Sequence, residues 1–567
     1  MDENIEKITA LAGNNNRYQY FTLVVATYLW INYSFITNAL PYLERGPLVN
    51  YIDDEGKNQT KLTLTNDVCR ETNEVYDIIE TFDYSWITEY HLECKSLEIG
   101  LIGTFAFIGK TLGGVIFTFL TKCLSHKKII IISSFGYFVV VFLCTIINSF
   151  DYFYYLLVLV LLVGFLGNLV LYSALVIAQE IVENKKRGLF GSIVNIGYAL
   201  SGILYTVVFL LAQKWRTVFY VVMVASFIGL VLLWIFVYDS PKSFIAKKDV
   251  KNTIYILEGI AKFNGILDEF RANLNTEENQ KIFNEIMGID RTVVIKNEEN
   301  NNNNDNKVIN FNNNNPDSSN NTENRMKETI NTNNNNNIEK TDTEKQKVQE
   351  FGMISIFKFK SIRGKFLILD IIWIGTRAAF NGVSISSKSF PGNFYVNIIV
   401  LYIIESVAYF VAGILIEIHK LGRKGTLWIM NAILIIAFLI LAFLKMEIAP
   451  LLTINYIARF SASAIEVIYY TYSIEVYPTP VRNAAFGVNC TLGNIGSVVV
   501  FLILEFVPNW VFLTIFATIT LLNTGLLIFL PETVGKPMVE TIEELRNKDI
   551  KEDEKNEQKN EEKNDEK

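Results

Sequence analysis

Long apolar runs alternate with short polar segments along most of the chain. A transmembrane helix needs about 20 mostly apolar residues, and stretches such as "VVMVASFIGLVLLWIFVY" (221–238) have no polar face to present to water. The pattern therefore predicts an all-α polytopic membrane protein rather than a large soluble protein with buried helices. Twelve predicted transmembrane helices lie near residues 18–40, 97–120, 129–148, 153–179, 188–211, 216–238, 364–386, 393–416, 424–444, 449–475, 482–506 and 509–531.

Composition agrees with this prediction and narrows the function. Half of the 567 residues are hydrophobic and 19% are charged, which is unusual for a soluble protein of this length. Three scattered histidines cannot build a His-based metal site, and no cofactor motif, catalytic Ser/His/Asp or Cys/His set, or nucleic-acid signature is present. The stretch "GTFAFIGKT" (103–111) is one residue too long for a phosphate-binding loop and lies inside a predicted helix. These features favour a secondary transporter over an enzyme or a nucleotide-driven pump.

The distribution of Lys and Arg predicts the orientation, because cytoplasmic loops carry an excess of these residues. The clusters are Lys122, Lys127 and Lys128; Lys185, Lys186 and Arg187; and Lys420, Arg423 and Lys424. Three basic residues fall on the opposite side: Lys214, Arg216 and Lys388. The excess of Lys and Arg in the cytoplasmic loops is therefore a statistical preference, not a strict rule. It places both termini (1–17 and 532–567) and the insert 239–363 in the cytoplasm. No cleavable signal precedes the first predicted helix.

The segment 42–96 is predicted to face the outside. It contains twelve acidic and five basic residues, two cysteines (Cys69 and Cys94) and the sequon "NQT" at Asn58. An oxidising exterior favours a Cys69–Cys94 disulfide over two free thiols, and it favours glycosylation at Asn58. These features favour the plasma membrane.

The cytoplasmic insert has two predicted parts. Residues 240 to about 290 are predicted to form short amphipathic helices. Residues 296–348 contain long asparagine runs, which cannot bury enough apolar surface to fold and are predicted to form a disordered linker. The tail 532–567 is charged and predicted to be solvated.

Several motifs resemble a known family. "SWITEYHLEC" (85–94) precedes the second predicted helix, and four further segments follow in matching order: "DSPKSFIAKKD" (239–249), "GNFYVN" (392–397), "EVYPTPVRNAAFG" (475–487) and "LPETVGKP" (530–537). The chain resembles the organic cation, anion and zwitterion transporters of solute carrier family 22, a branch of the major facilitator superfamily. The resemblance implies the major facilitator fold, in which two six-helix halves (18–238 and 364–531) move a small organic solute by alternating access.

The resemblance has two departures. The loop between the second and third helices reads "KCLSHKK" (122–128), with Lys122 in place of the family's acidic residue and Ser125 in place of its glycine. The corresponding loop "HKLGRK" (419–424) keeps Gly422 and Arg423 but has His419 in place of the acid. These motifs help to close one end of such transporters, so a non-transporting solute sensor is an alternative function.

Ionisable residues inside the membrane are the first candidates for a binding site, because burying one in lipid costs about 2.5–3.5 kcal/mol or more. The run 449–475 carries Arg459, Glu466 and Tyr470 on one helical face. The run 364–386 carries Arg377, Phe380 and Asn381. By the resemblance, Glu405 matches an acidic position of the family, and Asn494 matches its charge-selecting position.

Glu466 has two interpretations. It could supply the negative charge for a cationic solute, helped by cation–π attraction from Tyr470 and Phe380. Alternatively, it pairs with Arg377 or Arg459, which leaves a balanced cavity that suits a zwitterion. We therefore predict organic cations or zwitterions as cargo, with an organic anion or a sugar as the alternative.

Charged residues near the helix ends are predicted to take part in gating. By the resemblance, Glu180 with Arg187, and Glu475 with Arg482, form salt bridges of an inner gate near Arg423; interfacial anchoring is the alternative. If transport is coupled to an ion and that ion is a proton, the candidate residues are Asp370, Glu405 and Glu466. Lys110 has no assigned role.

Overall fold

A computed structural model describes most of the chain outside the asparagine tract and the C-terminal tail. The described residues are 2–13, 16–46, 48–52, 58–62, 77–80, 85–92, 95–147, 152–182, 187–246, 248–288, 293–294, 310–311, 360–386, 392–418, 421–477, 479–504 and 506–533. Within them, twelve helical segments are long and apolar enough to cross a membrane. The prediction of an all-α polytopic protein is confirmed.

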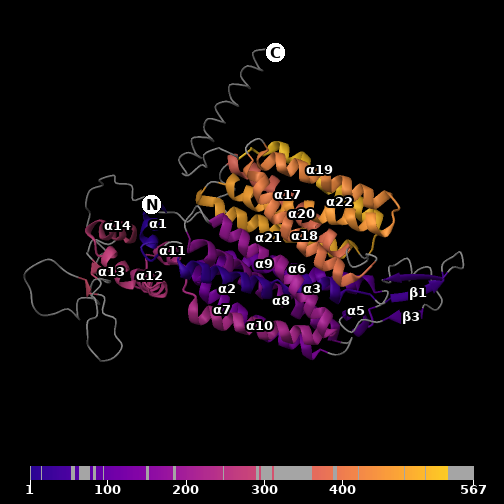
Figure 1. Cartoon of the computed structure of the whole chain (residues 1–567), viewed down its shortest axis with the longest axis horizontal. Helices are drawn as coiled ribbons and strands as arrows, with labels where there is room; N and C mark the ends of the chain where they lie inside the picture. Colours follow the sequence, from indigo (N-terminus) through magenta and orange to yellow (C-terminus); the bar gives the residue numbers. More distant parts are fainter. Residues whose placement is uncertain are drawn as a thin grey trace, which may run out of the picture.

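Six spans form the N-terminal half (Figure 1). The first span consists of two helices that meet at Ser34, and the second of them contains Pro41, which lacks a backbone N–H. The elements are α2 (Arg17–Tyr33) with α3 (Phe35–Leu43), α6 (Ser96–Cys123), α7 (His126–Ile146), α8 (Phe153–Glu180), α9 (Arg187–Ala212) and α10 (Trp215–Phe236).

The other six spans form the C-terminal half, coloured orange to yellow in Figure 1. They are α17 (Lys360–Ser386), α18 (Phe394–Glu417), α19 (Gly422–Phe443), α20 (Ile448–Val476), α21 (Thr479–Leu504) and α22 (Asn509–Leu526), which ends in the 3-10 turn η4 (Leu527–Phe529). The predicted helix ends differ from these bounds by a few residues.

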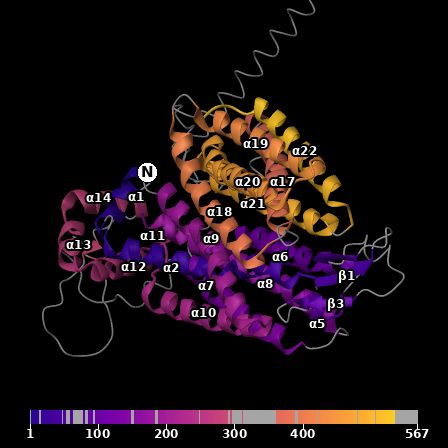
Figure 2. The same cartoon turned by 45° about the vertical axis from the view of Figure 1, so that its right-hand side comes forward.

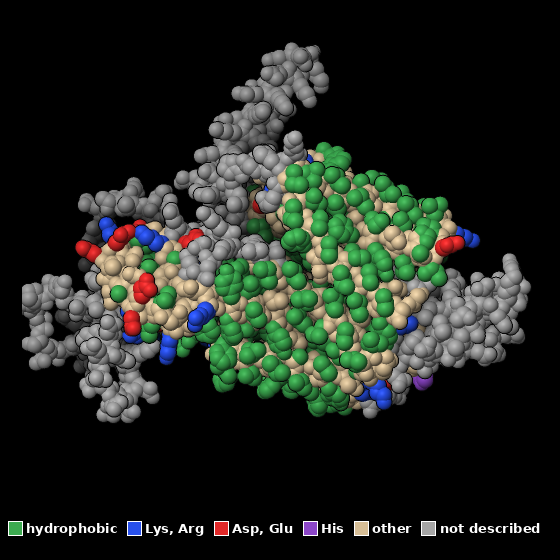
Figure 3. Space-filling model, in the orientation of Figure 1, with side chains coloured by type: hydrophobic (Ala, Val, Ile, Leu, Met, Phe, Trp, Pro, Cys, Tyr) green, Lys and Arg blue, Asp and Glu red, His purple; other side chains and the backbone are tan. Residues whose placement is uncertain are grey.

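Hydrophobic side chains cover the outside of the bundle, and charged side chains gather at its two ends (Figure 3). Large exposed residues such as Phe135, Trp234 and Phe410 belong to this surface. A surface of this kind is stable only against lipid, so it agrees with the prediction of a membrane protein.

The two halves pack together at the ends that the sequence predicts to face outside. The guanidinium of Arg45, just beyond α3, lies 4.0 Å from the ring centroid of Phe394 at the start of α18. The Tyr402 hydroxyl donates a hydrogen bond to Asn38 at 3.0 Å, and the rings of Tyr42 and Phe394 meet at 5.2 Å. These contacts join the two halves at this end, where α18 lies beside α9 of the N-terminal half (Figure 2).

A small helical unit lies at the opposite end, which the sequence predicts to be cytoplasmic, beside the N-terminal half (Figure 1). It consists of α1 (Asp2–Ala10), α11 (Pro241–Ala246), α12 (Val250–Asn264), α13 (Leu267–Leu274) and α14 (Glu277–Met287), with an apolar core of its own. Asn264 accepts a hydrogen bond from the backbone N–H of Tyr18 at 2.9 Å and donates one to the carbonyl of Ala12 at 3.0 Å. The N-terminal segment is thereby fastened to the insert.

The segment between the first two spans contains a small antiparallel sheet that the sequence analysis did not predict. Strand β1 (Leu48–Ile52) lies between β2 (Asn58–Leu62) and β3 (Asp77–Glu80). Asn58 begins β2, and its side chain lies outside the described part, as do both Cys69 and Cys94. The predicted glycosylation and disulfide therefore stay predictions.

A second, two-stranded pairing joins β4 (Val293–Val294) to β5 (Asn310–Phe311) at the edge of the predicted asparagine linker. The rest of the tract 296–348 lies outside the described residues.

The segment "SWITE" (85–89) supplies the acidic partner of Arg216. Ser85 caps the short helix α5 (Trp86–Glu89) by accepting a hydrogen bond from the backbone of Ile87. Glu89 then pairs with Arg216 at 2.6 Å and accepts a hydrogen bond from the Trp215 indole at 3.0 Å. Arg216, which the sequence places on the predicted outer side, thus has an acidic partner there.

Candidate functional site

A cavity lies between the two halves near the middle of the bundle. It has a volume of about 60 Å³, which holds a few water molecules rather than an organic solute, so the halves must separate to admit one. The N-terminal half contributes Trp30, Lys110, Asn168, Leu171, Tyr172, Asn195 and Tyr198, and the C-terminal half contributes Arg377, Tyr409, Glu466, Val467, Tyr470 and Asn494.

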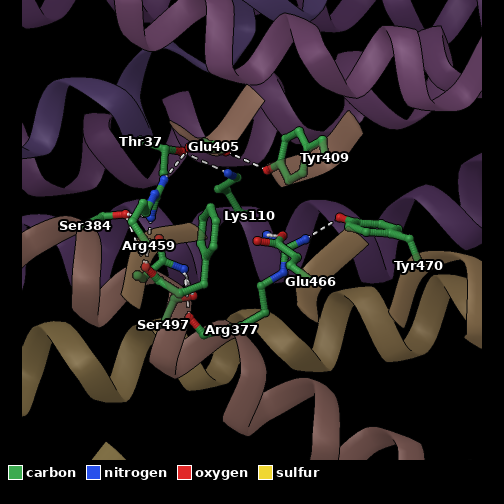
Figure 4. A network of polar contacts seen from close by, with 12 residues as sticks. Thr37, Lys110, Arg377, Ser384, Glu405, Tyr409, Arg459, Glu466, Tyr470 and Ser497 are labelled. Carbon is green, nitrogen blue, oxygen red and sulfur yellow. Dashed lines mark hydrogen bonds and ion pairs between the residues drawn. The ribbon is translucent and has the colours of Figure 1, made fainter. Parts of the chain in front are cut away.

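An ion pair forms one wall of the cavity. Arg377 of α17 lies 2.7 Å from a carboxylate oxygen of Glu466 on α20, and its other terminal nitrogen donates a hydrogen bond to the Tyr470 hydroxyl. Glu466 is only 4% exposed. Of the two interpretations of Glu466, the structure therefore shows the paired one, with Arg377 as the partner (Figure 4).

Small and aromatic neighbours hold this pair in place. Gly493 of α21 leaves room for Arg377, because a Cβ there would lie 3.1 Å from its side chain. The Trp373 indole donates to Ser473 on α20 at 2.9 Å, which ties α17 to α20 one turn away. The Arg377 guanidinium lies 5.6 Å from the ring centroids of both Trp373 and Tyr470. The orientation of Arg377 is thus fixed from several sides.

The second carboxylate oxygen of Glu466, Oε2, does not take part in the ion pair with Arg377. It is buried, and it has no hydrogen-bond partner in the described part of the chain. A buried carboxylate oxygen without a donor is costly. It therefore marks a place where a bound cationic group would be stabilised.

A second ion pair lies behind the cavity wall. Arg459 of α20 pairs with Glu405 of α18, which is 0% exposed. Arg459 also donates to the Phe380 carbonyl at 3.1 Å and lies 4.1 Å from the centroid of that ring. Glu405 accepts a hydrogen bond from Tyr409 at 2.6 Å. Tyr409 lines the cavity and connects it to this pair.

Half of the residues predicted for the binding site line the cavity: Arg377, Glu466, Tyr470 and Asn494. Phe380, Asn381, Glu405 and Arg459 do not, and they support the wall instead. Asn381 donates a hydrogen bond to Ser497 at 2.9 Å and so joins α17 to α21. The residue types of these four side chains were visible in the sequence, but their position behind the cavity wall was not.

Lys110 of α6 is the cavity residue without a predicted role. Its amine donates a hydrogen bond to Thr37 at 2.9 Å and lies 5.3 Å from the Phe107 ring. No ion pair joins it to a carboxylate among the described residues. In Figure 4, Lys110 lies between the two ion pairs. The available signal was a single lysine in an otherwise apolar run.

The N-terminal half supplies much of the aromatic lining, which the sequence analysis did not name residue by residue. Trp30, Tyr172 and Tyr198 face the Arg377–Glu466 wall together with Tyr409 and Tyr470. The Trp30 indole donates to the Leu171 carbonyl at 3.1 Å, which fixes the ring. Aromatic faces attract cations within about 6 Å.

Among the predicted gate residues, the structure describes one ion pair. Glu475 pairs with Arg423 at 2.9 Å and accepts a hydrogen bond from Thr533 at 2.6 Å. The side chains of Arg187 and Arg482 lie outside the described part. Glu180 keeps one buried oxygen without a hydrogen bond in that part. A gating role for these residues stays a prediction.

Comparisons with known proteins agree with this architecture. The family model of the Major Facilitator Superfamily matches residues 81–500. The chain is 24% identical over 475 residues to organic cation/carnitine transporter 2 of Rattus norvegicus, covering 82% of this chain and 72% of the relative. It is 27% identical over 207 residues to organic anion transporter 3 of Mus musculus, covering 35% of this chain and 37% of the relative.

Solved structures show the same fold. The partially occluded inward-open form of the xylose transporter XylE from E. coli aligns with a TM-score of 0.58 at 11% identity, covering 91% of this chain and 100% of that one. The human organic anion transporter MFSD10 aligns with a TM-score of 0.52 at 11% identity, covering 90% and 99%. The chain therefore belongs to the major facilitator superfamily and is a membrane transporter of the solute carrier family 22 type.

Proposed function

We propose that the chain carries small zwitterionic organic solutes, with one ammonium and one carboxylate group, across the membrane by alternating access. The observation that carries this proposal is the pair of opposite charges on facing walls of the cavity. The amine of Lys110 has no carboxylate partner in the described part, and Oε2 of Glu466 has no donor there.

A zwitterion meets both requirements at once. Its carboxylate accepts hydrogen bonds from Lys110 and is attracted by Arg377. Its cationic group is attracted by Oε2 of Glu466 and lies among the rings of Tyr172, Tyr198 and Tyr470. The charge-assisted hydrogen bond to the carboxylate and the electrostatic attraction of the cationic group replace lost hydration, so both buried charges of the solute are compensated.

The arrangement also links binding to movement. Lys110 belongs to the N-terminal half, whereas Arg377 and Glu466 belong to the C-terminal half. A solute that binds all three joins the halves across the cavity, while Arg45, Tyr42 and Phe394 close the outer side. Binding energy can therefore favour one arrangement of the halves over the other.

The charge count favours an organic anion as the second candidate. The cavity and its wall contain three basic residues, Lys110, Arg377 and Arg459, against two acidic ones, Glu405 and Glu466. The additional basic residue makes a simple cation a less favourable solute, because its charge would be repelled by like charges in a desolvated site. A plasma-membrane location belongs to the same proposal, supported by the acidic segment predicted to face outside.

The test is uptake by cells that express the protein, comparing a carnitine-like zwitterion, a quaternary ammonium and an aromatic carboxylate. We expect the zwitterion to accumulate fastest, and surface labelling confirms delivery to the plasma membrane. Uptake of only the carboxylate would favour the anion carrier. Saturable binding without accumulation of any of the three would favour the sensor.

Lys110→Met should weaken zwitterion transport specifically. Because hydrogen bonds to charged groups contribute about 1.5–3 kcal/mol, we expect KM for the zwitterion to rise about 10–100-fold. Uptake of the quaternary ammonium should not fall. Lys7→Met is the matched control, since Lys7 forms an exposed ion pair with Glu278 outside the membrane. Equal losses for both solutes would show that Lys110 is structural.

A further inference from the structure

Asp370 is a carboxylate buried in the membrane without a basic partner. It lies on α17 and is 6% exposed. Its only hydrogen bond in the described part comes from the side-chain amide of Asn489 on α21, and no ion pair reaches it there. Glu405 and Glu466, by contrast, each have an arginine. Asp370 is the buried acidic residue of the described spans that the transport site does not use.

Asn489 connects Asp370 to the cytoplasmic end of the C-terminal half. Its amide oxygen accepts a hydrogen bond from the Tyr477 hydroxyl at 2.7 Å, so its nitrogen is directed toward Asp370. Tyr477 directly follows α20, at the turn into α21, and its ring lies 6.3 Å from Phe366. A change of charge on Asp370 therefore reaches this turn through two hydrogen bonds.

Asp370 also lies in line with the solute cavity. It precedes Arg377 by seven residues, so both side chains share one face of α17 and are about 10 Å apart along the helix. Because α17 runs from the cytoplasmic to the outer side, Asp370 lies between the cavity and the cytoplasm.

The charged and titratable neighbours leave Asp370 isolated. The helix α22 has no titratable residue, and α3 contributes Tyr42 only at the outer end. The remaining groups on the packed elements are Lys360, Arg363, Lys365 and Arg377 of α17; Tyr456, Arg459, Glu466, Tyr469, Tyr470, Tyr472, Glu475 and Tyr477 of α20 and its turn; and Arg482 and Cys490 of α21, with the side chains of Lys360 and Arg482 outside the described part. Of these, Tyr477 is joined to Asp370, through Asn489.

We propose that Asp370 is the proton-binding site of a solute–proton symporter. This inference rests on the proposed function, since it names the ion that is coupled to solute movement. The Asp370 carboxylate takes up one proton from water when the cavity is open to the outside. It releases this proton to cytoplasmic water when the cavity opens inward. Each cycle forms and breaks one O–H bond and carries one net positive charge inward with each neutral zwitterion.

The physical reason is the cost of an unpaired charge in the membrane. An ionised Asp370 needs Asn489 and water, and the closed arrangement between the outward and inward openings excludes water. The protonated form is neutral and tolerates that dry arrangement. Protonation therefore lowers the free-energy cost of passing through the closed arrangement with the solute bound.

The test uses purified protein in liposomes with the carnitine-like zwitterion. With the outside one pH unit more acidic, wild type should accumulate the solute about tenfold. A gradient of one pH unit is a tenfold ratio of proton concentrations, and one proton moved with each solute molecule can sustain a solute ratio of the same size. Asp370→Asn should lose this accumulation and keep exchange at equal pH. Asp249→Asn is the control, since Asp249 caps α12 outside the membrane. Wild-type accumulation by Asp370→Asn would overturn the proposal, as would wild-type exchange that ignores the pH gradient.

A second measurement needs no solute and separates this proposal from the proposed function. Infrared difference spectra of the reconstituted protein between pH 8 and pH 5 should show a carboxylic-acid C=O band that Asp370→Asn lacks and Asn489→Leu shifts. Persistence of every such band in Asp370→Asn would overturn the proposal. If the band belongs to Asp370 but wild type does not exchange the zwitterion, the proton site stands and the solute assignment fails.

Discussion

Glu466→Gln is expected to abolish solute uptake and to destabilise the C-terminal half. The substitution leaves Arg377 buried in the cavity without its carboxylate, which lies 2.7 Å away in the structure. Breaking a buried ion pair by removing one partner typically costs about 3–5 kcal/mol. We expect zwitterion uptake to fall by about 100-fold or more, a loss of about 2.7 kcal/mol of binding or transition-state free energy.

Two variants separate the role of Glu466 in transport from its role in stability. Replacing both partners, as in Arg377→Met with Glu466→Leu, removes the unpaired charge and should restore the melting temperature toward wild type without restoring uptake. Glu278→Gln is the matched control for loss of an ion pair, since Glu278 and Lys7 form an exposed pair at 2.8 Å outside the membrane. Exposed pairs contribute little, so this variant should melt and transport as wild type does.

The measurements are radiolabelled uptake normalised to surface protein and thermal melting of the purified protein. If the double variant regains both stability and uptake, the pair is a structural element and the solute is bound elsewhere. If Glu466→Gln transports normally, Oε2 of Glu466 does not bind the solute, and the zwitterion proposal fails.

The sequence could predict the twelve spans because the membrane imposes their length and apolarity. A lipid-exposed backbone must satisfy its hydrogen bonds within the helix, so each span needs a long apolar run that is visible without any tertiary information. The predicted runs and the observed helices accordingly coincide to within a few residues. Short segments outside the membrane lack this constraint, and the sheet of β1, β2 and β3 was not predicted.

The sequence could identify the charged residues of the site but not their pairing. Arg377, Arg459 and Glu466 all lie on helix faces directed inward, and helical periodicity permits either arginine to reach Glu466. The choice depends on the rotation and depth of α17, α18 and α20, which only packing determines. Glu405 binds Arg459 and thereby leaves Arg377 for Glu466. Lys110 was noted but given no role, because its surroundings are formed by Thr37 and the opposite half and not by its neighbours in sequence.

The close packing of α17 against α21 gives the second large prediction. At Gly496, an added Cβ would overlap the carbonyl oxygen of Ile374 on α17, and it would lie 2.9 Å from that carbonyl carbon and 3.1 Å from the backbone nitrogen of Ala378. These are backbone atoms inside a helix, so they cannot rotate away as a side chain could. Gly496→Ala therefore forces the two helices apart.

We expect Gly496→Ala to cost at least the 1–3 kcal/mol or so typical of an overpacked core, and to lower the yield of monodisperse protein. Gly413→Ala is the matched control, because Gly413 lies on α18 and a Cβ there meets nothing within 4 Å. It should be neutral or slightly stabilising, since Ala favours a helix over Gly by about 1 kcal/mol. Equal melting temperatures for the two variants would contradict the prediction.

The substitution at Gly496 should also reduce transport beyond its effect on folding. Ile374 precedes Arg377 by less than one helical turn, so displacing α17 moves the guanidinium relative to Glu466 and Tyr470 on α20. The folded fraction of Gly496→Ala should therefore bind the zwitterion more weakly than the Gly413→Ala protein does. A normal KM in the folded fraction would show that the cavity tolerates such a displacement, and that α17 need not hold Arg377 as rigidly as its neighbours Gly493 and Trp373 indicate.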